Sequence, residues 1–295
     1  MAKVKTLKNL YPFKSHFYTL SSQQHCRLHY VDEGTDEAVV MLHGNPTWSF
    51  YYRHLIKFLK PMYRCLALDH IGCGFSDKPQ KYNYCLQQHI ENALEWLKGI
   101  KIGHFHLIVH DWGGAIGMGI ATRWPASVQS LTILNSGAFL SDKIPLRIAL
   151  CRLPFIGPWA IKHLNIFAKA ATHMAVCHPL DGATKAGYLY PYNKTEYRVA
   201  INAFVQDIPM SPSHPTYEVL EQIQENLWLL EQKPCLLAWG MQDFCFTPAF
   251  LEQWQHYLPH ATVHRFENAG HYVLEDAKDE INPLIRRFLL SHPLR

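Results

Sequence analysis

Asp111 has the residue type and surroundings of a nucleophile. It lies in the segment LIVHDWGGAIG, directly after an apolar run and just before Gly113 and Gly114. That context predicts a tight strand-to-helix turn that holds the Asp111 carboxylate above the end of a sheet, where a helix N-terminus stabilises its charge. A carboxylate here, in place of a serine, can displace a leaving group from an sp3 carbon and form an ester. Carbon–halogen bonds, epoxides and strained lactones are therefore candidate targets.

Two later residues complete a candidate catalytic triad. Asp243 ends the segment WGMQD, and His271 lies in NAGHYVLED, so the three residues follow in the order nucleophile, acid, base. Asp243 would orient His271 and stabilise its imidazolium form, and His271 would act on a proton of water or substrate. A helix-capping role is the competing interpretation of Asp111 alone. Three residues in this order, each near the end of an expected strand, favour catalysis.

Two further side chains could stabilise a departing anion. The segment HGNP, with Asn45 at its third position, follows an apolar strand where an oxyanion-binding loop is expected, and Trp112 is adjacent to the nucleophile. The amide of Asn45 and the indole N–H of Trp112 are hydrogen-bond donors. We expect both to face negative charge that develops as a bond to carbon breaks. A turn asparagine and a packed tryptophan are the structural alternatives.

Short apolar runs alternate with segments of helical spacing through most of the chain. This order predicts an α/β protein with a mostly parallel central sheet and helices on both faces. The alternation stops after Asn135 and resumes at 234, so we expect a core domain over 1–137 and 216–295 and an inserted helical cap over 138–215. The expected strands are 16–20, 26–31, 38–42, 63–68, 104–110, 128–134, 234–240 and 262–266, and the expected helices are 48–59, 86–98, 114–123, 248–257 and a last one from 272.

Composition excludes several classes of function. The 295 residues are 48% hydrophobic and 18% charged with a net charge of +4, which is typical of a soluble globular protein and gives no support to nucleic-acid binding. No secretory signal or apolar span is evident, so we expect a cytoplasmic protein whose eight cysteines are free thiols. There is no CxxC pair and no HExxH segment, and we expect neither a metal nor a cofactor.

Three segments together resemble the haloalkane dehalogenase branch of the α/β-hydrolase superfamily. They are HGNPTWSFYYR, DHIGCGFSDKP and HDWGGAIG. The resemblance covers almost the whole chain. It implies an α/β-hydrolase fold in which Asp111 is the nucleophile, His271 the base and Asp243 the acid. It also implies that Asn45 and Trp112 hold the leaving halide.

A closer likeness lies in the second half of the chain. The segments YPYNKTEYRVAINAFVQDIPM, LLAWGMQDFCF and HRFENAGHYVLEDAKDEINPLIRRF resemble the β-lactone decarboxylases of bacterial long-chain olefin biosynthesis. This resemblance implies that a cis-3-alkyl-4-alkyloxetan-2-one is converted to a cis-alkene and carbon dioxide. The triad serves this reaction and dehalogenation equally, so it does not decide between them. Attack at the alkoxy carbon and attack at the carbonyl carbon both remain open.

Two further functions compete with these interpretations. Epoxide hydrolases combine the same triad with cap tyrosines that protonate the opening ring, and the expected cap holds four candidates: Tyr188, Tyr190, Tyr192 and Tyr197. A binding protein on the same fold is the non-catalytic alternative.

The expected cap combines apolar and basic residues. Residues 144–180 mix Ile, Leu, Phe, Trp and Pro with basic side chains, which suggests a cavity for a hydrophobic substrate and a basic outer face. That face could meet a membrane surface or other enzymes of olefin biosynthesis, or its lysines could simply be solvated. The sequence makes no prediction of oligomeric state. The basic residues are Lys143, Arg147, Arg152, Lys162 and Lys169.

Overall fold

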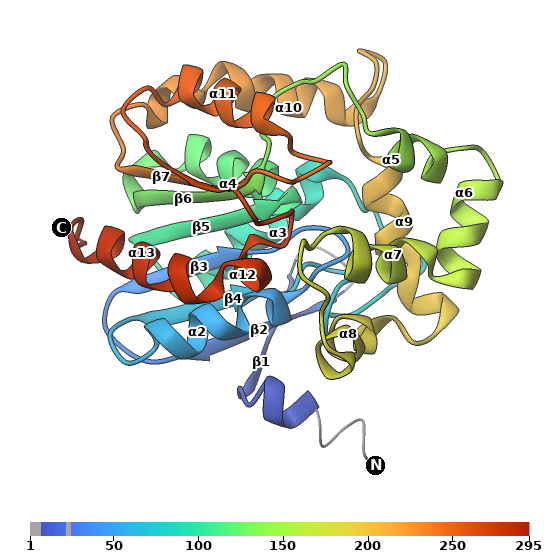
Figure 1. Cartoon of the computed structure of the whole chain (residues 1–295), viewed down its shortest axis with the longest axis horizontal. Coiled ribbons are helices and arrows are strands. Elements are labelled where there is room, and N and C mark those ends of the chain that lie inside the picture. Colours follow the sequence, from blue (N-terminus) through green and yellow to red (C-terminus); the bar gives the residue numbers. More distant parts are fainter. Residues whose placement is uncertain (1–6, 22–24, 295) are drawn as a thin grey trace.

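An eight-stranded sheet forms the centre of the computed structural model, which describes residues 7–21 and 25–294 (Figure 1). The strand order is β1-β2-β4-β3-β5-β6-β7-β8. The pairings β1 with β2 and β2 with β4 are antiparallel, and all the others are parallel. The strands are β1 (Ser15–Thr19), β2 (Arg27–Glu33), β3 (Ala38–Leu42), β4 (Arg64–Leu68), β5 (Phe105–Asp111), β6 (Val128–Ser136), β7 (Cys235–Gly240) and β8 (Thr262–Phe266).

The central strands are apolar at nearly every position because both faces of the sheet are covered. In β3, Val40 and Leu42 pack into one hydrophobic cluster, while Val39 and Met41 pack into another on the opposite face. Side chains alternate between the faces of a strand, so a strand buried on both sides needs a continuous apolar run. This is the run AVVML in the sequence.

Helices cover the two faces as the α/β pattern predicted (Figure 1). One cluster contains residues of α3 (Leu86–Gly99), α4 (Trp112–Arg123), α10 (Pro215–Glu225) and α11 (Pro248–Tyr257). The other contains residues of α2 (Arg53–Leu59), α12 (Val273–Asp276) and α13 (Lys278–Leu290). The fold class expected from the sequence is therefore confirmed.

The connection between β6 and β7, all of which is described, contains helices joined by loops and no strand. Those before α10 lie together on one side of the sheet domain (Figure 1). The assignment of 138–215 as a separate cap remains our proposal. The helices are α5 (Leu146–Cys151), α6 (Ile156–Trp159), a π-helical turn η3 (Ala160–Leu164), α7 (Ile166–Met174), α8 (Gly182–Leu189), α9 (Val199–Gln206) and the short 3-10 turns η4 (Tyr190–Tyr192) and η5 (Thr195–Arg198). Elsewhere, 3-10 turns occur at η1 (Ser49–Tyr52), η2 (Pro125–Ser127) and η6 (Leu227–Leu230).

Each end of the expected strands lies within two residues of the observed end. Two expected helices differ. The helix expected over 48–59 consists of the 3-10 turn η1 followed by α2, and the helix expected from Tyr272 consists of α12 and α13, which are separated at Ala277. All eight cysteines are free thiols. Within the described residues, no helix has the length and apolarity needed to cross a membrane.

Candidate active site

The turn between β5 and α4 presents Asp111 in a strained conformation. Asp111 ends β5 with φ 53° and ψ −128°, and α4 begins at the next residue. A positive φ is uncommon outside glycine and typical of residues held in place at functional sites. The glycines that follow are needed for close packing, because a Cβ atom on Gly113 would lie 2.0 Å from the Leu42 carbonyl oxygen and one on Gly114 would lie 1.7 Å from Ser136 Oγ. The predicted tight turn from strand to helix is therefore present.

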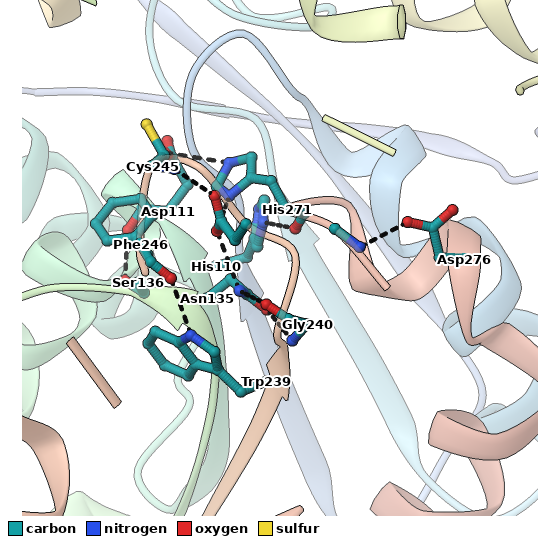
Figure 2. Close-up of polar contacts among 12 residues, drawn as sticks. His110, Asp111, Asn135, Ser136, Trp239, Gly240, Cys245, Phe246, His271 and Asp276 are labelled. Carbon is teal, nitrogen blue, oxygen red and sulfur yellow. Dashed lines mark hydrogen bonds and ion pairs between the residues drawn. The ribbon is translucent and has the colours of Figure 1, made fainter. Parts of the chain in front are cut away.

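The three predicted triad residues meet at the carboxyl end of the sheet. Figure 2 shows two of them, Asp111 and His271, side by side. His271 Nδ1 donates to Asp243 Oδ2 at 2.7 Å, and His271 Nε2 lies 3.5 Å from Asp111 Oδ2. All three side chains are buried. The imidazole thus lies between two carboxylates, as the order nucleophile, acid, base predicted.

Charge in this buried site favours the imidazolium form of His271. Burial alone would disfavour the cation, but the negative charge of Asp243 and the hydrogen bonds to both carboxylates outweigh it and raise the pKa of His271 to about 10. Burial also opposes ionisation of Asp111, yet the hydrogen bond and charge of His271 lower the pKa of this carboxyl group. At neutral pH the site therefore holds an ionised Asp111 beside a protonated His271.

Asn135 positions Asp243 and was not singled out from the sequence. Its Nδ2 donates to Asp243 Oδ2 at 3.0 Å. The same Nδ2 donates to the Gly240 carbonyl oxygen at 2.9 Å, and Asn135 Oδ1 accepts from the Gly240 N–H at 2.8 Å (Figure 2). The Cys245 N–H donates to Asp243 Oδ1 at 2.6 Å. The available signal was the position of Asn135 near the end of an apolar strand, close to the edge where the triad was expected.

His110 positions His271 through its backbone, and it too was missed. Its Nε2 donates to the His271 carbonyl oxygen at 2.9 Å, and its ring stacks on Tyr51 with centroids 4.2 Å apart. Burial lowers the pKa of His110 to about 3, so it is neutral and can keep one nitrogen as a donor and the other as an acceptor. A polar residue inside an apolar strand, next to Asp111, was the signal in the sequence.

Asn45 contacts Asp111 through its backbone. The Asn45 N–H donates to Asp111 Oδ1 at 2.6 Å, and its side-chain Nδ2 donates to the Ile201 carbonyl oxygen of α9 at 3.1 Å. The side-chain oxygen Oδ1 of Asn45 is buried without a hydrogen-bond partner. Trp112 is partly buried, and the centroid of its ring lies 5.4 Å from the centroid of the Phe204 ring. The structure therefore places both predicted anion-binding residues beside Asp111, and their role stays a prediction.

A largely apolar cavity of 260 Å³ opens onto Asp111. The triad end contributes Asn45, Trp112 and His271, while α5 and α7 contribute residues such as Ile148 and Phe167. The remaining lining comes mostly from aliphatic and aromatic side chains. Such a cavity suits a hydrophobic molecule with one reactive polar group.

The tyrosines proposed as ring-opening acids lie elsewhere. None of Tyr188, Tyr190, Tyr192 and Tyr197 is among the described residues that line this cavity. The Tyr188 hydroxyl donates to Glu275, and the Tyr192 hydroxyl donates to the Thr47 carbonyl oxygen at 3.3 Å. This arrangement does not support the epoxide hydrolase alternative.

Comparison with known proteins identifies the family of the chain. The α/β hydrolase fold family model matches residues 37–159 and 176–278. The chain is 42% identical to the cis-3-alkyl-4-alkyloxetan-2-one decarboxylase of Shewanella oneidensis, over 96% of this chain and 90% of that one. It is 30% identical to haloalkane dehalogenase 2 of Mycobacterium tuberculosis, over 95% and 96% of the two chains.

A solved structure shows the same architecture. The haloalkane dehalogenase DatA of Agrobacterium tumefaciens superposes with a TM-score of 0.84 and 26% identity, covering 94% of this chain and 96% of that one. The matches extend over both the sheet domain and the helical connection between β6 and β7. The chain therefore belongs to the α/β-hydrolase fold family and, within it, to the family that includes the cis-3-alkyl-4-alkyloxetan-2-one decarboxylases.

Proposed function

We propose that this enzyme decarboxylates cis-3-alkyl-4-alkyloxetan-2-ones, which are β-lactones, to cis-alkenes and carbon dioxide. The observation that carries the proposal is an ionised Asp111 carboxylate at the polar end of an apolar cavity. That arrangement fits a molecule with two alkyl chains and one strained polar ring. The 42% identity to a decarboxylase, against 30% to a dehalogenase, supports the lactone over a haloalkane.

Attack of Asp111 at the ring carbon that bears the lactone oxygen gives a balanced reaction. An Asp111 oxygen forms a bond to this carbon, the carbon–oxygen bond of the ring breaks, and the ring oxygen leaves as part of a carboxylate. The bond from the carboxylate to the neighbouring carbon then breaks. Its electrons form the alkene, the Asp111 ester bond cleaves, and carbon dioxide leaves. Inversion followed by anti elimination gives a cis-alkene from a cis-lactone and restores Asp111 without water.

The leaving carboxylate would stay close to the positively charged and N–H-bearing groups around Asp111. His271, protonated in the free enzyme, and the N–H donors of Asn45 and Trp112 would stabilise this anion. Because the anion remains covalently attached to the substrate, it would replace the charge that Asp111 loses in the ester. His271 would then stay protonated and would be a poor base for activating water. This favours elimination over hydrolysis of the ester.

Dehalogenation is the second candidate, because the same site can hold a haloalkane. Halide would leave from the attacked carbon, and a neutral His271 would then activate water to hydrolyse the Asp111 ester.

For the lactone, attack at the carbonyl carbon is an alternative first step of the decarboxylation. The proposed partners are a hydrophobic substrate and other enzymes of olefin biosynthesis, and the proposed location is the cytoplasm.

The proposal is tested by offering the purified enzyme a long-chain cis-β-lactone and, separately, 1-bromobutane. Alkene is followed by gas chromatography and halide by an ion assay. We expect alkene from the lactone and little halide from the bromoalkane. Halide without alkene would assign the protein to the dehalogenases.

The same incubation can show whether water attacks the Asp111 ester. The enzyme is run through many turnovers in water labelled with heavy oxygen, and the peptide that contains Asp111 is weighed by mass spectrometry. Elimination leaves this peptide unlabelled. Hydrolysis at the Asp111 carbonyl transfers heavy oxygen into it, so a labelled peptide would contradict the elimination step.

A further inference from the structure

One segment exposes far more apolar side chain than the rest of the protein. Of the thirteen large hydrophobic residues that are exposed in the described chain, eight lie between 146 and 166. We call these eight residues the cap apolar surface. Clustered exposed apolar residues mark binding surfaces, whereas isolated ones do not. The residues are Leu146, Leu150, Leu153, Phe155, Ile156, Trp159, Leu164 and Ile166.

Phe155 lies at the tip of this surface in a strained turn. Its φ of 64° and ψ of −52°, with a 2.7 Å hydrogen bond from the Ile156 N–H to the Pro154 carbonyl oxygen, define a γ-turn of the rare, positive-φ type. The side chain is 90% exposed, so no packing within the chain compensates for this strain. Strain of this kind is usually retained where a residue has a function. Here it presents a phenyl ring to the outside.

The charge of the same segment has one sign. Residues 143–180 contain Lys143, Arg147, Arg152, Lys162 and Lys169 but no aspartate or glutamate. Lys143, Arg147 and Lys169 are exposed. A mixture of apolar and aromatic side chains with Lys and Arg, and no acidic residue, is complementary to a membrane surface that carries anionic lipids.

The cap apolar surface is continuous with the active-site cavity. Along α5, Ile148 and Cys151 line the cavity, while Leu146 and Leu150 are exposed. Lys143 and Arg147 line the cavity and are also exposed. A ligand that leaves the cavity past α5 therefore meets apolar side chains and basic groups, and α5 and α6 lie at the outer edge of the molecule (Figure 1).

We infer that the cap apolar surface binds a bilayer containing anionic lipid. Phe155, Ile156 and Trp159 enter the boundary between headgroups and acyl chains, and the basic residues contact lipid phosphates. A projecting ring on a short turn fits this soft surface better than the flat face of a protein. If the proposed function holds, the bilayer is also where a long-chain lactone and its alkene would dissolve, but lipid binding itself does not depend on that function.

Co-sedimentation with vesicles tests this inference on the full chain. We compare vesicles of phosphatidylcholine alone with vesicles of about 70% phosphatidylcholine and 30% phosphatidylglycerol. The protein should sediment with the anionic vesicles and be released by salt. The double variant Phe155→Ser/Ile156→Ser should require at least about tenfold more lipid for half-maximal binding, because two apolar side chains are lost from the interface.

Two further variants separate the contributions. Lys169→Glu should weaken binding to anionic vesicles several-fold. Trp228→Ser is the matched control, because Trp228 is 66% exposed but lies in η6, outside the cap apolar surface, and its loss should leave binding unchanged. Neither Phe155 nor Ile156 lines the cavity, so activity on a short-chain lactone in the absence of lipid should be the same in the double variant.

Three results would overturn the inference. The first is no sedimentation with anionic vesicles, and the second is binding that the double variant retains in full. The third is self-association of the wild type in analytical ultracentrifugation that the double variant abolishes while no vesicle binding occurs, because the surface would then join two copies of the chain. The vesicles contain no substrate, so each result is independent of the decarboxylase proposal.

Discussion

Replacing Asp243 with asparagine should change the charge of His271 more than its position. In the wild type, Asp243 Oδ2 lies 2.7 Å from His271 Nδ1. The substitution Asp243→Asn keeps the shape of the side chain but removes its negative charge. Two unit charges about 4 Å apart interact by about 4 kcal/mol at the effective dielectric constant near 20 that suits protein sites. This energy corresponds to a change of about 3 in pKa. The pKa of His271, about 10 in the wild type, should therefore fall to near 7.

This change should also slow the reaction. With a pKa near 7, about half of His271 is neutral at neutral pH and no longer stabilises the Asp111 carboxylate or the departing anion, and the introduced amide can present an N–H where the imidazole needs an acceptor. Turnover should drop about a thousandfold or more, as expected when the acid of a triad loses its charge. The fold should survive, because the Cys245 N–H can still donate to the side-chain oxygen that remains at the Oδ1 position, and only the hydrogen bond from Asn135 to Oδ2 is lost.

An NMR titration of imidazole-labelled protein measures the pKa directly. The His271 signal is assigned by its absence in His271→Gln, and turnover of the β-lactone is measured on the same samples. A His271 pKa that stays near 10 in Asp243→Asn, with turnover within about twofold of the wild type, would refute the electrostatic account.

Two predictions concern stability. Arg53 is buried and pairs with Glu275, with Arg53 Nη2 2.9 Å from Glu275 Oε2, and the Tyr188 hydroxyl donates to the same carboxylate. Glu275→Gln leaves the buried Arg53 charge without its partner and should lower the free energy of unfolding by about 3–5 kcal/mol. A loss below about 1 kcal/mol in a urea titration would contradict this. His271 has a folded-state pKa of about 10, above the unfolded value near 6.5, so its contribution to stability is complete below pH 6.5 and is lost as the pH rises through 10. Between these pH values, the free energy of unfolding of the wild type should fall by on the order of 1 kcal/mol per pH unit more than that of His271→Gln. Thermal melts of both proteins measure it, and the same pH dependence in both would contradict the prediction.

The sequence predicted those features of the fold that follow from local pattern. Buried strands such as β3 and β5 appear as continuous apolar runs, and the glycines after Asp111 indicated a turn too tight for a side chain. The interruption of the alternation after Asn135 indicated the helical connection. The proximity of Asp111, Asp243 and His271 was predictable because their chain order and their position at strand ends are visible without coordinates.

Features that depend on contacts between distant segments were not predictable in the same way. Asn135 positions Asp243 across 108 residues, and His110 positions His271 across 161. Neither contact leaves a local pattern, because each residue alone is only a polar side chain at a strand end or in a strand. The exposure of Phe155 was also hidden, since an apolar residue in a cap is usually buried.

Asn45 and Trp112 were both predicted from the sequence to face a departing anion. The structure places them beside Asp111 on the cavity wall, and it adds an unexpected contact between the Asn45 amide and Ile201 in α9. This contact uses one of the two amide hydrogens and leaves the other for a leaving anion. It also links the predicted anion-binding residue Asn45 to α9.

The most direct test of the central claim is the rate of cis-alkene formation from a cis-β-lactone by Asp111→Asn. The account predicts a loss of at least about a thousandfold, with an unchanged melting temperature and retained binding of the lactone, because an amide cannot serve as the nucleophile. Formation of cis-alkene at a rate close to that of the wild type would contradict the assignment of Asp111 as the nucleophile.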